Sequence, residues 1–172
     1  MTTAPEKTPE QPEPTEKPTT VDQLAQLAHA YQVPVSPQTL QEIAPNGKVD
    51  SQRATAFEDY LKTTASGLYP TLAPQIKAGI PTAYLLDPYR QTGKNVLGPQ
   101  FEPDFSADPN ARAALEGGVD PQTGRPAPMS LSQWQAHLKS DPAFGYLQTP
   151  QGQAEKRQVL TRIQQAFQGT AS

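Results

Sequence analysis

Few residues of this chain are of a type that performs catalysis or binds metal ions. None of its 172 residues is cysteine, which excludes disulfides, thiol chemistry and thiolate metal sites. The two histidines, His29 and His137, lie in separate predicted helices, and neither has a second histidine at the spacing of a metal pair. Asp141 follows His137 by four residues but lies beyond the predicted end of that helix. We therefore expect surface or edge histidines and no metal site.

Three carboxylates, Glu102, Asp104 and Asp108, cluster within one short segment. Two such groups could serve as the acid and the base of a glycosidase. Here they stand among proline and phenylalanine, and two of the three are explained as turn or helix-cap residues. The chain also lacks the G-x-S-x-G elbow of a serine nucleophile, the Walker loop and the G-x-G-x-x-G motif. We expect a protein that is not an enzyme, with no catalytic residue and no cofactor.

Charge and hydropathy exclude two further classes of partner. The formal net charge is −3 and the isoelectric point is about 5.4, which argues against binding driven by nucleic-acid phosphates. The longest apolar stretch, residues 83–86, is far shorter than the roughly 20 residues that span a membrane. The start of the chain has no basic region followed by an apolar one, which predicts no signal peptide. We expect neither a specific nucleic acid nor a membrane as a partner.

Proline accounts for 20 residues and is unevenly distributed. Five prolines lie in residues 1–20, where Thr, Glu, Lys and Gln make up most of the remainder and leave almost nothing apolar to bury. This segment is predicted to be an extended, acidic arm of polyproline II character. Pro9 and Pro12 form a P-x-x-P pattern of the kind that aromatic-lined grooves bind. The arm is either a solvated tail or a segment that becomes ordered along a partner surface through contacts such as these two prolines.

Several of the other prolines directly follow Asp, Ser or Thr and so indicate helix starts. The polar side chain accepts hydrogen bonds from the free amides of the first turn. Proline lacks an amide hydrogen, but at the first helical position that hydrogen would have no partner within the helix. No stretch alternates apolar and polar residues for the length of a strand. We therefore predict one all-α domain over 21–169, a compact bundle of short helices, with a tail at 170–172. The predicted starts are Ser36-Pro37, Asp87-Pro88, Asp108-Pro109, Asp141-Pro142 and Thr149-Pro150.

Apolar residues recur at helical spacing along these segments and define a candidate core. The last predicted helix, 150–168, contributes three of them, and its Lys and Arg residues form a modest basic face that is expected to be solvated. Phe101 and Phe105 instead lie in a predicted loop flanked by prolines, so we expect them to be exposed and to contact a partner. The candidate core residues are Phe57, Leu61, Tyr69, Ile76, Tyr89, Trp134, Leu138, Tyr146, Leu160, Ile163 and Phe167.

The order of several short motifs resembles a helical module of minor structural and internal virion proteins of tailed bacteriophages. The resemblance covers residues 21–167, and we expect the chain to depart from the family in having no long enzymatic or tape-measure segment before the module. It implies packing roles, and no catalytic role, for Tyr69, Trp134 and Tyr146. The motifs are Gly67-Leu68-Tyr69-Pro70, Pro88-Tyr89, Leu97, Met129-Ser130-Leu131, Trp134, Leu138, Asp141-Pro142, Phe144-Gly145-Tyr146 and Phe167.

The resemblance implies a non-enzymatic structural protein of a virion, assembled in the cytoplasm of the bacterial host. Its partners would be capsid, portal, connector or tail subunits, bound through the helical body and the arm, with multiple copies in each particle. Two alternatives remain at this point. The chain could be a scaffolding adaptor that leaves the mature particle, or a module associated with a cell-wall hydrolase.

Overall fold

A computed structural model describes residues 17–169 of the chain, and the structural statements below concern these residues. Most of the predicted arm, with Pro9 and Pro12, and the predicted tail at 170–172 lie outside them. The last residues of the predicted arm do contact the body. Pro18 is buried, the amide of Val49 donates to the carbonyl oxygen of Thr19 over 3.0 Å, and Thr20 forms an isolated β-bridge with Lys48.

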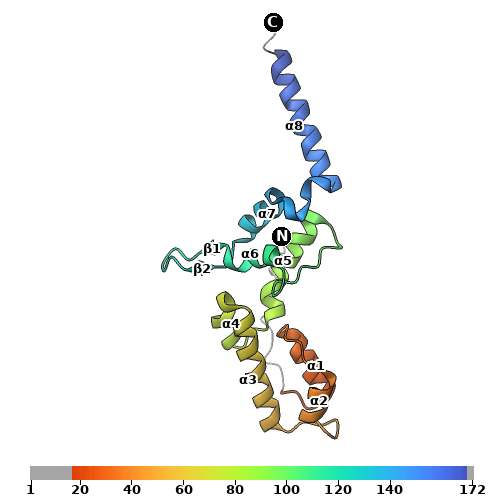
Figure 1. The fold of residues 1–172 in the computed structure, drawn as a ribbon, viewed down its shortest axis with the longest axis vertical. Helices are drawn as coiled ribbons and strands as arrows, with labels where there is room; N and C mark the ends of the chain where they lie inside the picture. The colour runs from red at the N-terminus through yellow and green to blue at the C-terminus, as the bar shows by residue number, and fades with distance from the viewer. Residues whose placement is uncertain (1–16, 170–172) are drawn as a thin grey trace, which may run out of the picture.

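The first three helices each begin directly after a residue that caps them. Thr20, Ser36 and Asp50 each accept a hydrogen bond from the amide three residues further on. These helices form the lower part of the molecule in Figure 1, with a short helical connection above them. The elements are α1 (Val21–Ala30), α2 (Pro37–Ile43), α3 (Ser51–Leu68), the 3₁₀ helix η1 (Pro70–Leu72) and α4 (Ala73–Lys77).

The central helix α5 (Thr82–Leu97) contradicts one predicted helix start. Asp87-Pro88 was expected to end one helix and begin another, but Pro88 lies inside a single continuous helix. Proline in a helix interior costs about 3 kcal/mol. Pro88 is exposed, whereas Leu86 and Val96 are buried on either side of it. Burial of the apolar face on both sides of the proline offsets that cost and keeps the helix continuous.

The second half consists of short helices and one small hairpin. Asp108, Ser130, Asp141 and Thr149 each cap a helix in this half. With the cap at Ser36, those at Asp108, Asp141 and Thr149 confirm four of the five predicted proline-marked starts. The all-α class is also confirmed, since the only sheet in the described part is this two-stranded hairpin. The elements are α6 (Pro109–Glu116), β1 (Gly118–Val119), β2 (Pro126–Ala127), α7 (Leu131–Ser140), η2 (Pro142–Phe144), η3 (Tyr146–Gln148) and α8 (Pro150–Gly169).

One hydrophobic core runs through α1 to α7 and includes most of the predicted core residues. Trp134 lies at its centre without exposed surface, and its indole N–H donates to the carbonyl oxygen of Tyr89 over 3.0 Å. Tyr89 is half-buried against the core, and its hydroxyl donates to the carbonyl oxygen of Met129 over 2.7 Å. The predicted core residues that are buried are Phe57, Leu61, Tyr69, Ile76, Trp134, Leu138 and Tyr146.

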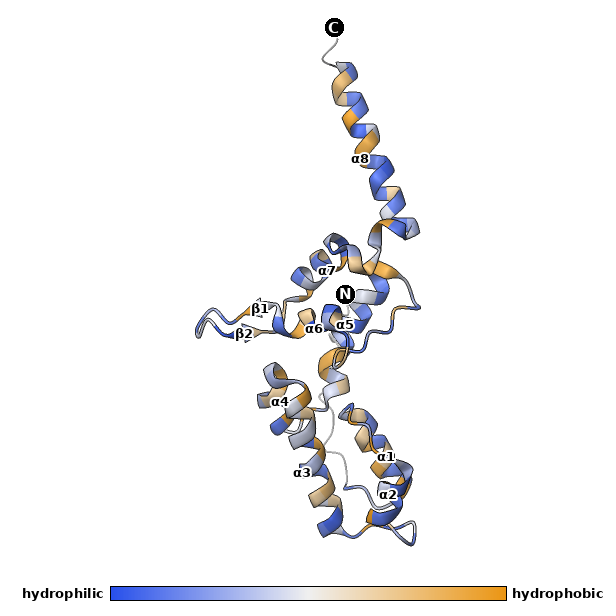
Figure 2. Ribbon diagram, in the orientation of Figure 1, coloured by the Kyte–Doolittle hydropathy of each residue, from blue (hydrophilic) through white to orange (hydrophobic). Residues whose placement is uncertain are grey.

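The expectation that α8 contributes to the core is wrong. Leu160, Ile163 and Phe167 expose 50%, 45% and 74% of their surface. Helix α8 packs on the body at its base, where Gly152 is buried and Glu155 forms an ion pair with Lys139, and then projects away from the other helices (Figure 1). Leu160 and Ile163 therefore remain exposed beyond the base of the helix, and Figure 2 shows apolar residues as orange bands along α8.

Candidate interaction surfaces

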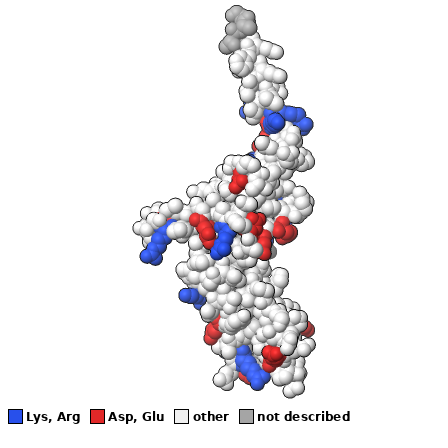
Figure 3. Space-filling model, viewed as in Figure 1, with Lys and Arg blue, Asp and Glu red and all other residues white. Residues whose placement is uncertain are grey.

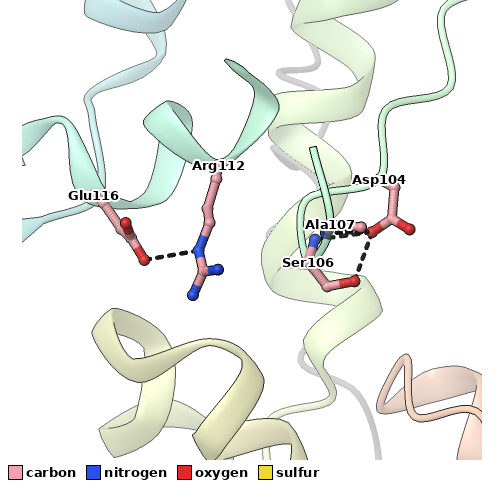
Figure 4. Close-up of polar contacts among 5 residues, drawn as sticks. All are labelled: Asp104, Ser106, Ala107, Arg112 and Glu116. Atoms are coloured by element: carbon pink, nitrogen blue, oxygen red, sulfur yellow. Dashed lines mark hydrogen bonds and ion pairs between the residues drawn. The ribbon is translucent and has the colours of Figure 1, made fainter. Parts of the chain in front are cut away.

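The acidic loop between α5 and α6 is held by its own hydrogen bonds. One carboxylate oxygen of Asp104 accepts from the amide and the hydroxyl of Ser106 over 2.9 and 2.6 Å, and from the amide of Ala107 over 3.1 Å (Figure 4). These bonds hold the pKa of Asp104 below its usual value. On the adjoining helix, Arg112 donates to Glu116 over 2.9 Å, a pair four residues apart that supports α6 (Figure 4). Asp104 therefore organises the loop.

The other two acids of this segment also have structural partners. Glu102 forms an ion pair with Lys94 of α5, which lowers the pKa of the Glu102 carboxyl. Asp108 caps α6 by accepting from the amide of Asn110 over 2.9 Å. The residues described in the structure contain no group of three His, Cys, Asp or Glu side chains that could hold a metal ion. The three carboxylates thus give the loop its shape and a negative charge.

The two histidines lie on different helices, α1 and α7, and in different settings. His29 is exposed in the last turn of α1. His137 stacks on Trp134 with ring centres 5.7 Å apart, and its Nε2 lies 3.6 Å from a carboxylate oxygen of Asp141. Asp141 reaches it because this residue ends α7 and caps η2. His137 is therefore an edge residue of the aromatic core.

The expectation that Phe105 is an exposed partner contact is wrong, because its side chain is 1% exposed. Its ring centre lies 6.4 Å from that of Tyr89 and 6.4 Å from that of Trp134. The hydrogen bonds of Asp104 fold the loop back and drive Phe105 into the core. An aromatic residue in a loop was interpreted as exposed, but burying a ring of this size stabilises the fold more than leaving it in water.

Phe101 is half-buried and forms one wall of an open groove. Its ring packs over Gly93 of α5, where a Cβ atom would collide with the ring carbons, and stands edge-on to Phe144 with ring centres 6.1 Å apart. Of the two predicted aromatic contacts, Phe101 keeps a surface that a partner could touch. Its contact with Gly93 explains why a glycine occurs inside this helix.

The groove has a volume of about 790 Å³ and lies between the loop after α5 and the segment that leads into α8. Leu97, Phe101 and Phe144 provide apolar surface in it. Glu102 and Asp104, both exposed, and the half-buried Asp108 provide negative charge. Lysine and arginine are absent from the described residues that line it. The groove therefore combines an apolar wall with an acidic rim.

The projecting part of α8 combines an apolar stripe with positive charge. Val159, Leu160, Ile163 and Phe167 follow one another at helical spacing and share one face. Three cations, Lys156, Arg157 and Arg162, occur along the same part of the helix, and residues 156–169 contain no acid. Figure 3 shows blue atoms on α8, and red atoms together with some blue ones on the body below it. Among the described residues, these three cations form no ion pair.

The base of α8 is fixed to the body by one ion pair and one close backbone contact. Lys139 of α7 donates to Glu155 over 2.9 Å, and its ammonium lies 5.1 Å from the ring centre of Tyr146. Lys139 holds the pKa of Glu155 below its usual value. Gly152 lies against the carbonyl oxygen of Tyr146, where any side chain would collide. These contacts set the direction in which the rest of the helix projects.

A second cavity, about 440 Å³, lies where α1 meets α5. Arg90 donates to the side-chain oxygen of Gln32 over 2.7 Å and lies over the ring of Phe105. Gln32 has a φ of 56°, a left-handed conformation that ends α1, and its side-chain amide donates to the carbonyl oxygen of His29 over 2.8 Å. Hydrogen bonds to the helix end and to Arg90 thus compensate a backbone conformation that Gln adopts at some cost.

Sequence reasoning missed the exposure of α8 and the groove beside its base. The signal for the first was present, because a basic helix with a narrow apolar stripe can be a docking helix as well as a core helix. The groove depends on how two loops distant in sequence meet, which no local pattern predicts.

Comparison of the chain with protein-family models, curated proteins and solved structures found no match. No helix in the described range is long and apolar enough to cross a membrane.

Proposed function

We propose that this chain is a non-enzymatic structural protein of a bacteriophage virion, a minor component of the head, connector or tail. Its role is to bind other virion proteins, with α8 and the N-terminal arm as the binding elements. The phage assignment derives from the motif resemblance over residues 21–167. The binding role derives from α8.

The observation that carries the binding role is the exposed apolar stripe on α8. Leu160 and Ile163 each expose about half of their surface on a helix that the body does not cover. Most of the stability of an amphipathic helix comes from packing its apolar face, so a helix that leaves this face in water is not stabilised by it. Helices of this kind commonly bind with their apolar face in a groove of a partner. A partner groove would bury the stripe, and the gain from apolar burial would stabilise the complex.

The arm supports the same role from the other end of the chain. Thr19 and Thr20, the last residues of the predicted arm, contact the body at Val49 and Lys48. An extended proline-rich segment reaches about 3.1 Å per residue and can lie along a neighbouring subunit. Multiple copies in a particle would add the avidity that a weakly binding arm needs.

The test is mass spectrometry of purified particles of the phage or prophage whose genome encodes the chain. The proposal predicts that the protein is retained in mature particles in a fixed ratio to the capsid protein. Its absence from mature particles but presence in assembly intermediates would instead identify a scaffolding adaptor. A zone of clearing when the purified protein is applied to peptidoglycan would contradict the non-enzymatic role.

A further inference from the structure

Helix α8 and the groove at its base have complementary surfaces. The helix presents Leu160 and Ile163 among three cations, and the groove presents Phe101 and Phe144 within an acidic rim. Both surfaces occur in every copy of the chain. We propose that α8 of one copy docks into the groove of a second copy, with its apolar stripe against the aromatic wall and its cations at the carboxylate rim. The inference names the partner for the binding role of α8 and therefore rests on the proposed function.

The contact must form between copies, because α8 cannot reach its own groove. Pro150, the first residue of α8, lies at the edge of the groove. At 1.5 Å per residue, Leu160 and Ile163 lie about 15–20 Å further along a straight helix. Beyond Glu155, which pairs with Lys139, the helix projects away from the body (Figure 1). The stripe is therefore out of reach of its own groove and available to that of a neighbour.

Charge selects the groove over a second α8 as the partner of the stripe. Pairing two stripes face to face would bring together two helices that each carry three cations and, from residue 156 to 169, no acid. Like charges at a helix interface oppose association, whereas the acidic rim of the groove, with Glu102 and Asp104, attracts the cationic helix. Both carboxylates have pKa values below their ordinary range, so both are ionised at neutral pH. The ion pair between Glu102 and Lys94 offsets part of this charge, and Asp104 and Asp108 supply the remainder.

The geometry of such a contact fits an assembly of many copies. The two surfaces are different patches of one chain, so the contact is heterologous. Each copy can therefore bind one neighbour through its α8 and another through its groove. Two copies can exchange helices reciprocally, and repeated contacts can close a ring or continue as a filament.

The test combines two variants that each damage one surface. Leu160→Asp with Ile163→Asp places charge in the apolar stripe, with Gln158→Asp and Gln165→Asp on the opposite face as the matched control. Glu102→Lys with Ala143→Arg reverses the rim and fills the groove. Its matched control makes the same two changes, Glu42→Lys and Ala56→Arg, in a separate cavity beside α2 and α3. Thermal unfolding of each variant verifies that the body remains folded.

The measurement is sedimentation velocity over a range of protein concentrations. We expect the wild-type chain and both controls to associate, more weakly at high salt, and each surface variant to bind itself at least about tenfold more weakly. A mixture of the two surface variants should form a one-to-one complex, because one supplies an intact groove and the other an intact helix. A wild-type chain that stays monomeric, or a mixture that does not associate, would overturn the proposal.

The outcome for the proposed function is separate. If the chain does not associate with itself but still enters particles by means of α8, the second-copy contact is wrong and the structural role stands. If it associates with itself in solution and is absent from particles, the contact stands and the virion role is wrong.

Discussion

At the scale of single residues, two glycines inside helices have opposite surroundings. Gly67 in α3 has no atom within 4 Å of the position that a Cβ would take. Gly93 in α5 would place its Cβ against the ring of Phe101. The first glycine therefore costs helix stability without a packing benefit, while the second allows a loop aromatic to seal one wall of the groove.

We predict opposite effects of alanine at these two positions. Gly67→Ala should raise the free energy of unfolding by about 0.5–1 kcal/mol, because alanine loses less conformational freedom in a helix. Gly93→Ala should lower it by about 1–3 kcal/mol, because the added methyl group must displace the Phe101 ring. Urea unfolding monitored by circular dichroism measures both. Stabilisation by both substitutions would show that Phe101 does not pack on α5 as described.

At the scale of elements, helix starts were predictable and helix surroundings were not. Thr20, Ser36 and Asp50 cap helices because a side-chain oxygen satisfies free amides within the next turn, which is local chemistry that the sequence displays. Pro88 was misleading because tertiary burial on both sides of it outweighs its local cost. The apolar spacing of α8 correctly predicts a helix, but spacing alone does not distinguish a face covered by the body from one left for a partner.

The candidate site was predicted in part. The sequence predicts that two of the three acids Glu102, Asp104 and Asp108 are turn or cap residues, and the hydrogen bonds of Asp104 and Asp108 confirm this. Phe105 was wrongly placed at the surface, since nothing local indicates that the loop folds back onto Trp134. The groove results from that folding and from the segment before α8, and it needed the three-dimensional arrangement.

The attachment of α8 gives a test at this scale. Gly152→Ala should make the free energy of forming the isolated helix more favourable by about 1 kcal/mol, because alanine has a higher helix propensity than glycine. We nevertheless expect it to lower the thermal unfolding midpoint, because its methyl group would collide with the backbone oxygen of Tyr146, which cannot rotate away. Gln151→Ala, at the exposed neighbouring position, serves as the control and should change stability little. A higher midpoint for Gly152→Ala would mean that α8 is not held against η3.

At the scale of the whole molecule, a packed helical body carries α8 as a projecting element and holds an acidic groove at its base. The body provides stability and direction, and the exposed stripe provides the surface for binding. Within the body, Asp104 holds a turn, Asp108 caps α6 and His137 packs against Trp134. Assembly should therefore depend on α8.

The most direct measurement is the amount of the chain in purified particles when α8 is altered. We expect Leu160→Asp with Ile163→Asp to reduce incorporation at least about tenfold, because charged side chains cannot occupy an apolar partner surface. The opposite-face variant, Gln158→Asp with Gln165→Asp, should enter particles at the wild-type level. Equal incorporation of the wild-type chain and the stripe variant would contradict the central claim that the exposed stripe of α8 binds the assembly.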